Sequence, residues 1–203
     1  VLRQPVVRWF FASLLFHVMA HFAIYGFLSL YLDARGYSKA MIGLLWAVSV
    51  LVEIAWFFSQ GRLLRGLAMT RWLWVCGGAA AIRMALTGGA ADWLPALFIA
   101  QVLHALSFAT HHTACIAMVT RHFPGRLRGR GQALFTVIGY GFGGTIGVVA
   151  GGALASRFGF EAMYGAAAVL AVLGTACAWR TDRLERAAAD GVPAFVTAEQ
   201  DSG

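Results

Sequence analysis

The chain has 203 residues, of which 60% are hydrophobic and 12% are charged, with a mean hydropathy of +0.70. A soluble domain has about 45–50% apolar and about 25% charged residues, so these values exclude a soluble enzyme, a disordered protein and a disulfide-rich secreted module. The net charge of +7 comes mainly from short arginine clusters between apolar runs, a pattern typical of membrane-protein loops, and we expect no nucleic-acid partner.

Six apolar runs follow one another along the chain, each about as long as the roughly 20 residues that cross a bilayer. None alternates with the period of a β-strand, so all six are predicted to be transmembrane helices of an all-α membrane protein. Residues 180–203 are polar and are predicted to form a disordered cytoplasmic tail. The predicted helices cover residues 10–32, 40–60, 72–90, 93–120, 132–155 and 162–179.

The basic residues predict the topology, because cytoplasmic loops are enriched in Lys and Arg. If the N-terminus is cytoplasmic, the outside loops hold only Arg35, Lys39 and Arg157, and twelve arginines lie inside. We therefore expect a multi-pass protein of the cytoplasmic (inner) membrane with an even number of helices and both termini inside. The inside arginines are Arg3, Arg8, Arg62, Arg65, Arg71, Arg121, Arg126, Arg128, Arg130, Arg180, Arg183 and Arg186.

The connections divide the six helices into two groups of three, joined by a basic segment at residues 121–130. Three plus three helices in opposite orientation form one half of many secondary transporters. We expect such a 3+3 inverted repeat here. The basic segment is interpreted as a cytoplasmic anchor that meets anionic lipid headgroups, with anion binding as the alternative.

Of the Asp, Glu, Lys and Arg residues, two lie within predicted helices, where a charge is costly and indicates function. Glu53 is flanked by apolar side chains, and Arg83 lies in the next helix. Glu53 is therefore a candidate for proton coupling. Alternatively, the two residues form a structural ion pair. A rise of about 1.5 Å per residue separates them by roughly 8 Å along the membrane normal, a distance that a long Arg side chain could span. Arg83 is also a candidate for binding a substrate carboxylate through two parallel hydrogen bonds.

Polar side chains recur on one face of the first and fourth predicted helices, spaced as i, i+4, i+8 and as i, i+7, i+11. Such side chains face protein or water rather than lipid, so we expect them to line a substrate cavity or to hydrogen-bond neighbouring helices. No carboxylates accompany the histidines, and neither a metal nor a cofactor is predicted. The cavity residues predicted on these two helices are His17, His21, Tyr25, Gln101, His104 and His111, with Cys115 on the same stripe as His111. Tyr140, on the fifth predicted helix, is added as an aromatic surface for a substrate.

A row of glycines marks the fifth predicted helix, where Gly139, Gly143, Gly147 and Gly151 follow at intervals of four. Repeated G-x-x-x-G lets another helix backbone approach closely. The row therefore predicts helix packing, and a smooth face of this kind would also permit sliding between helices.

Residues 25–57 (YGFLSLYLDARGYSKAMIGLLWAVSVLVEIAWF) and 104–135, which include FPGRLRGRGQAL, resemble the C-terminal half of a major facilitator superfamily transporter, in the branch of the phenylpropionate permeases. The resemblance extends over residues 9–179. The superfamily loop signature is weaker, since GRLLRGLAMTR (residues 61–71) lacks the usual Asp.

The resemblance implies that this chain supplies six helices of a twelve-helix fold, with substrate held between the two halves and uptake driven by proton symport. The implied partners are the lipid bilayer, an N-terminal six-helix half or a dimer mate, a proton, and a small organic solute such as an aromatic acid. In that family the helices of His17 and His104 line the cavity, whereas the helix of Arg83 lies outside it. The first residue is Val1 rather than Met, so we expect a segment before it.

Two other classes of function compete with transport. A rhomboid-type intramembrane protease needs a Gly-x-Ser-x-Gly-like motif and a histidine two helices later; the sequence has neither, so no enzyme is expected. A non-transporting remnant, or a helix-packing partner for another chain, is the remaining alternative.

Overall fold

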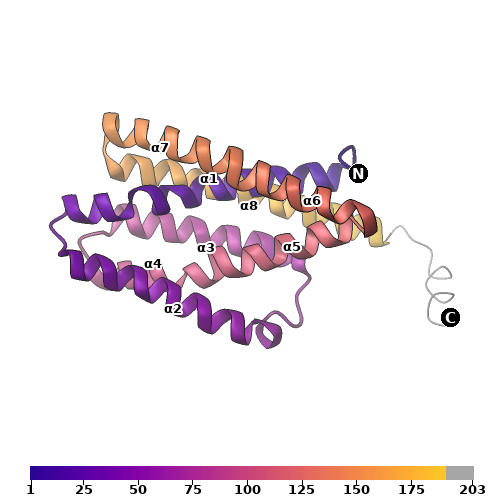
Figure 1. Cartoon of the computed structure of the whole chain (residues 1–203), viewed down its shortest axis with the longest axis horizontal. Helices are drawn as coiled ribbons and strands as arrows, with labels where there is room; N and C mark the ends of the chain where they lie inside the picture. Colours follow the sequence, from indigo (N-terminus) through magenta and orange to yellow (C-terminus); the bar gives the residue numbers. More distant parts are fainter. Residues whose placement is uncertain (191–203) are drawn as a thin grey trace.

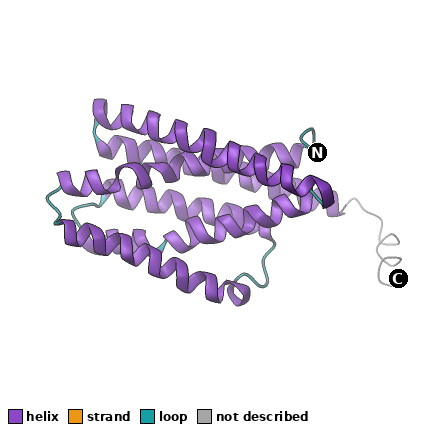
Figure 2. Ribbon diagram, in the orientation of Figure 1, coloured by secondary structure: helices purple, strands orange, loops and turns teal. Residues whose placement is uncertain are grey.

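The computed structural model describes residues 1–190, and every regular element among them is a helix (Figures 1 and 2). Two of the helical segments are interrupted by π-helices, labelled η1 and η3. The elements are α1 (Pro5–Ala34), α2 (Lys39–Leu63), α3 (Met69–Gly89), α4 (Leu94–Val102), η1 (Ala105–Thr110), α5 (His111–His122), the 3-10 turn η2 (Gly125–Leu127), α6 (Arg128–Phe135), η3 (Thr136–Gly143), α7 (Gly144–Phe158) and α8 (Phe160–Asp190).

The helices overlap all six predicted apolar runs, which confirms the prediction of an all-α chain. Within residues 1–190, five helical stretches are long and apolar enough to cross a bilayer: α1, α2, α4 to α5, η2 to α7, and α8. The run at α3 is helical but is not among them, because Arg83 lowers its mean hydropathy. A sixth crossing by α3 remains a prediction.

The helices run along the long axis of the molecule, and α1 begins at the end where α8 stops (Figure 1). α8 packs against α1 and α3, whereas α2 packs mainly on α4 and η1. Much of α2 is exposed, including Leu51 at 64% and Phe58 at 89%. Exposed apolar side chains of this kind suit contact with lipid or with another transmembrane helix.

The glycine row lies against α1. A Cβ atom added to Gly147 would lie 2.7 Å from the carbonyl oxygen of Met19, and one added to Gly143 would lie 3.3 Å from that of Leu15. Gly139 and Gly151 also face α1 side chains. The absence of side chains along this row therefore allows the α7 and α1 backbones to approach closely.

The prediction of a disordered tail from residue 180 is wrong for residues 180–190, which continue α8. Two of their acidic side chains, Asp182 and Glu185, are buried against other helices. Asp182 is 1% exposed and accepts a 2.6 Å hydrogen bond from the Thr70 hydroxyl of α3, while Glu185 pairs with two basic side chains at the end of α5. Residues 191–203, the rest of the predicted tail, lie outside the described residues.

We expect Asp182→Ala to lower the free energy of unfolding by about 1–3 kcal/mol, because the buried Thr70 hydroxyl loses its acceptor. Chemical unfolding in detergent measures this change. The matched control is Asp190→Ala, which removes an exposed carboxylate from the same helix. Equal stability of the two variants would contradict the role given to Asp182.

Candidate functional site

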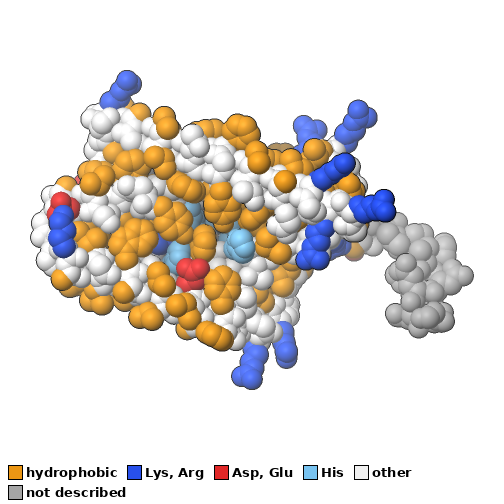
Figure 3. All heavy atoms as spheres, viewed as in Figure 1, with side chains coloured by type: hydrophobic (Ala, Val, Ile, Leu, Met, Phe, Trp, Pro, Cys, Tyr) orange, Lys and Arg blue, Asp and Glu red, His pale blue; other side chains and the backbone are white. Residues whose placement is uncertain are grey.

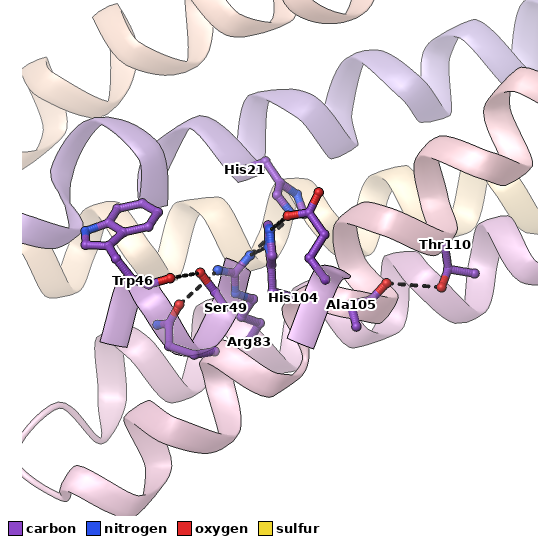
Figure 4. Close-up of polar contacts among 9 residues, drawn as sticks. His21, Trp46, Ser49, Arg83, His104, Ala105 and Thr110 are labelled. Carbon is purple, nitrogen blue, oxygen red and sulfur yellow. Dashed lines mark hydrogen bonds and ion pairs between the residues drawn. The ribbon is translucent and has the colours of Figure 1, made fainter. Parts of the chain in front are cut away.

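The centre of the candidate site is Arg83 on α3, whose side chain is fully buried. Its Nη1 donates hydrogen bonds to His104 Nδ1 at 3.0 Å and to His21 Nε2 at 3.4 Å (Figure 4). Its Nη2 donates to the Gln101 side-chain oxygen at 3.3 Å. The guanidinium group is therefore surrounded by three neutral acceptors from α1 and from the α4–η1 segment.

Glu53 joins this cluster through His104. The Oε2 atom of Glu53 lies 2.9 Å from His104 Nε2, on the other side of the imidazole from Arg83. Glu53 and Arg83 do not form the direct ion pair that was one of the two alternatives for them; the ion-pair partner of Glu53 is His104. The physical reason is packing: α2 lies on α4 and η1, so an imidazole from that segment stands between the two charges.

The contacts of His104 fix the position of its proton. Because a guanidinium group only donates, Nδ1 must accept from Arg83. The proton of the neutral imidazole is therefore on Nε2 and is donated to the Glu53 carboxylate. His104 therefore bridges the two charged groups: it accepts from the buried Arg83 guanidinium and donates to the Glu53 carboxylate, and the two charges are not in direct contact.

The site reaches the surface in the middle of one face of the molecule. Figure 3 shows an acidic side chain beside histidines there, surrounded by hydrophobic side chains, whereas Lys and Arg gather toward the ends. The Glu53 side chain is 22% exposed and Tyr25 is 37% exposed. The other predicted cavity residues on α1, α4 and α5 are buried. We call Glu53 and Tyr25 the rim of the site, and the buried residues its interior.

Aromatic rings frame the rim. Tyr25 stacks on Trp46 with ring centroids 6.2 Å apart, and the Trp46 indole donates to the Ser29 hydroxyl at 3.0 Å. Phe108 stacks on His104 at 5.0 Å. Trp46 and Phe108 were missing from the sequence-based site, although Phe108 follows His104 by four residues and so had the spacing of a shared face.

The histidines of the interior form a second group beside the first. The rings of His17 and His111 lie parallel with centroids 3.5 Å apart, and His17 Nε2 donates to the Ser107 carbonyl at 2.7 Å. The π-helix η1 separates His104 from His111 along the chain, so the predicted stripe is divided: His104 contacts Arg83, whereas His111 contacts His17 and lies 3.7 Å from the Cys115 sulfur. His17, His111 and Tyr140 line one small pocket.

Among residues 1–190, no group of three or more His, Cys, Asp or Glu side chains is arranged to hold a metal ion. The stacked geometry explains this for the histidines, because parallel rings do not direct their nitrogen atoms at a common point.

Comparison with known proteins identifies relatives of the chain. The model of the "MFS_1 like family" matches residues 1–166. Over 130 residues the chain is 29% identical to a protein of Escherichia coli (strain K12) named "Probable 3-phenylpropionic acid transporter". That match covers 64% of this chain but 33% of the relative, so the aligned region spans about a third of the relative's length. No solved structure matches the chain.

Proposed function

The chain belongs to the MFS_1 like family, and from this membership we propose that it forms the C-terminal six-helix half of a proton-coupled importer for a small organic acid. In this proposal α3 provides the sixth crossing, the helices form a 3+3 inverted repeat, and both ends face the cytoplasm. An N-terminal half or a second copy completes the cavity. The relative's printed name and the apolar helices support transport rather than catalysis.

The observation that carries the proposal is the row of Arg83, His104 and Glu53 inside an apolar helical protein. Charged groups at such a position are costly and are retained for ion or substrate pathways. Arg83 is fully buried, and Glu53 is the partly exposed end of the row. We assign proton binding to Glu53, because it is the carboxylate of the row and its side chain is 22% exposed.

An aromatic acid is the proposed substrate class. The relative's printed name supports this class, and so do the rings of Tyr25, Trp46 and Phe108 beside the charged row. Flat apolar rings suit an aromatic group, while the buried positive charge suits a carboxylate.

We expect Glu53→Gln to abolish the stimulation of uptake by an inward proton gradient, because an amide cannot carry the proton. Exchange of labelled for unlabelled acid at equal pH, which needs no net proton movement, is expected to persist. Both rates are measured in proteoliposomes of the native polypeptide with 3-phenylpropionate as the probe. Asp190→Asn, an exposed acid-to-amide change, is the control. Uptake by Glu53→Gln that still follows the gradient would remove Glu53 from the coupling role.

A further inference from the structure

His21 is the second imidazole held by Arg83, and its proton can also be located. Its Nε2 faces the guanidinium Nη1 at 3.4 Å and must accept, since the guanidinium only donates. A doubly protonated ring would set an N–H group against another N–H group beside a buried cation. His21 is therefore neutral, with its proton on Nδ1.

The resulting Nδ1–H group is buried and has no hydrogen-bond partner in the structure. This is unusual, because buried donors in proteins are nearly always paired. The corresponding donor of His104 is already used by Glu53. Of the two imidazoles that Arg83 orients, only His21 thus retains a free donor.

The side chains around His21 are largely aromatic. Its side chain lines the same small pocket as Tyr25, Phe108 and Tyr140. The rings of Tyr25 and Phe108 lie 6.1 and 6.2 Å from the His21 ring. Tyr25 is the exposed member of this lining, so its ring stands between the buried His21 donor and the surface.

We propose that His21 Nδ1–H binds an oxygen of the substrate carboxylate, while Tyr25 and Phe108 take up the aromatic group. The proposal rests on the function proposed above and names the residue that selects an acid. Arg83 is then a positioning residue: it orients both imidazoles and supports their donors without touching the substrate.

The test replaces His21 with Asn or with Gln, because each of these amide side chains can take the place of one imidazole nitrogen. The side-chain nitrogen of Asn lies near the place of Nδ1, whereas the amide of Gln reaches the place of Nε2, where Arg83 is bound. We expect His21→Asn to keep the KM for 3-phenylpropionate within about threefold of wild type. His21→Gln should raise it about tenfold to a hundredfold, as for the loss of one hydrogen bond to a charged group.

A purely structural role for His21 predicts the reverse order, because the contact with Arg83 is made by Nε2. A smaller defect in His21→Gln than in His21→Asn would therefore overturn the inference. Nitrogen-15 NMR of the native protein labelled at histidine gives an independent reading, in which His21 carries its proton on Nδ1 and its signal shifts with 3-phenylpropionate. A proton on Nε2 would overturn the inference even if uptake is normal. Absence of any wild-type response to this acid would instead remove the proposed substrate class, and with it the ligand of His21.

Discussion

Arg83→Leu is expected to abolish uptake and to lower the free energy of unfolding by about 3–5 kcal/mol, because three buried acceptors lose their donor together. The effect on transport has a separate cause. Without the guanidinium group, nothing fixes the tautomer of His21, and no positive charge supports the Glu53 carboxylate.

Unfolding in detergent and uptake into proteoliposomes measure the two effects of this variant. Arg157→Leu, which removes an exposed arginine, serves as the control and should change neither quantity markedly. A double-mutant cycle of Arg83→Gln with Glu53→Gln tests the link through His104, for which we expect a coupling energy of about 0.5–3 kcal/mol. Additive effects would show that the row does not act as a unit.

Gly147→Leu is expected to have the second largest effect, a loss of about 3 kcal/mol or more of stability. The new Cβ atom would lie 2.7 Å from the Met19 carbonyl oxygen and 3.0 Å from the Met19 Cα atom. These are backbone atoms that cannot rotate away, so α7 must separate from α1. Gly165→Leu is the matched control, because that glycine is exposed on α8 and has open space around it. Similar melting temperatures for the two variants would contradict close packing at Gly147.

The positions of the helices could be predicted because lipid leaves an apolar segment few alternatives to a helix. The glycine row was also predictable, since a spacing of four residues places all its members on one face. The continuation of α8 was not, because Asp182 is stabilised by Thr70, a partner distant in sequence and close only in the fold.

The polar residues of the site were visible in the sequence, but their partners were not. Counting residues from the helix ends placed Glu53 and Arg83 at depths that allowed a contact. Whether they pair depends on which side chain lies between them. The lateral packing of α2 on η1 inserts His104 there, and hydropathy carries no information about such packing. The π-helix η1 likewise divides His104 from His111, which a regular helical spacing had placed on one stripe.

Measuring proton movement together with the substrate tests proton-coupled transport through Glu53. The native polypeptide is reconstituted in weakly buffered proteoliposomes, and the external pH is recorded when 3-phenylpropionate is added. Proton-coupled uptake predicts an alkalinisation larger than that of protein-free vesicles, which correct for passive permeation of the acid. The Glu53→Gln variant is expected to lose this additional alkalinisation. Accumulation of the acid with no pH change beyond that of protein-free vesicles would contradict proton-coupled transport through this site.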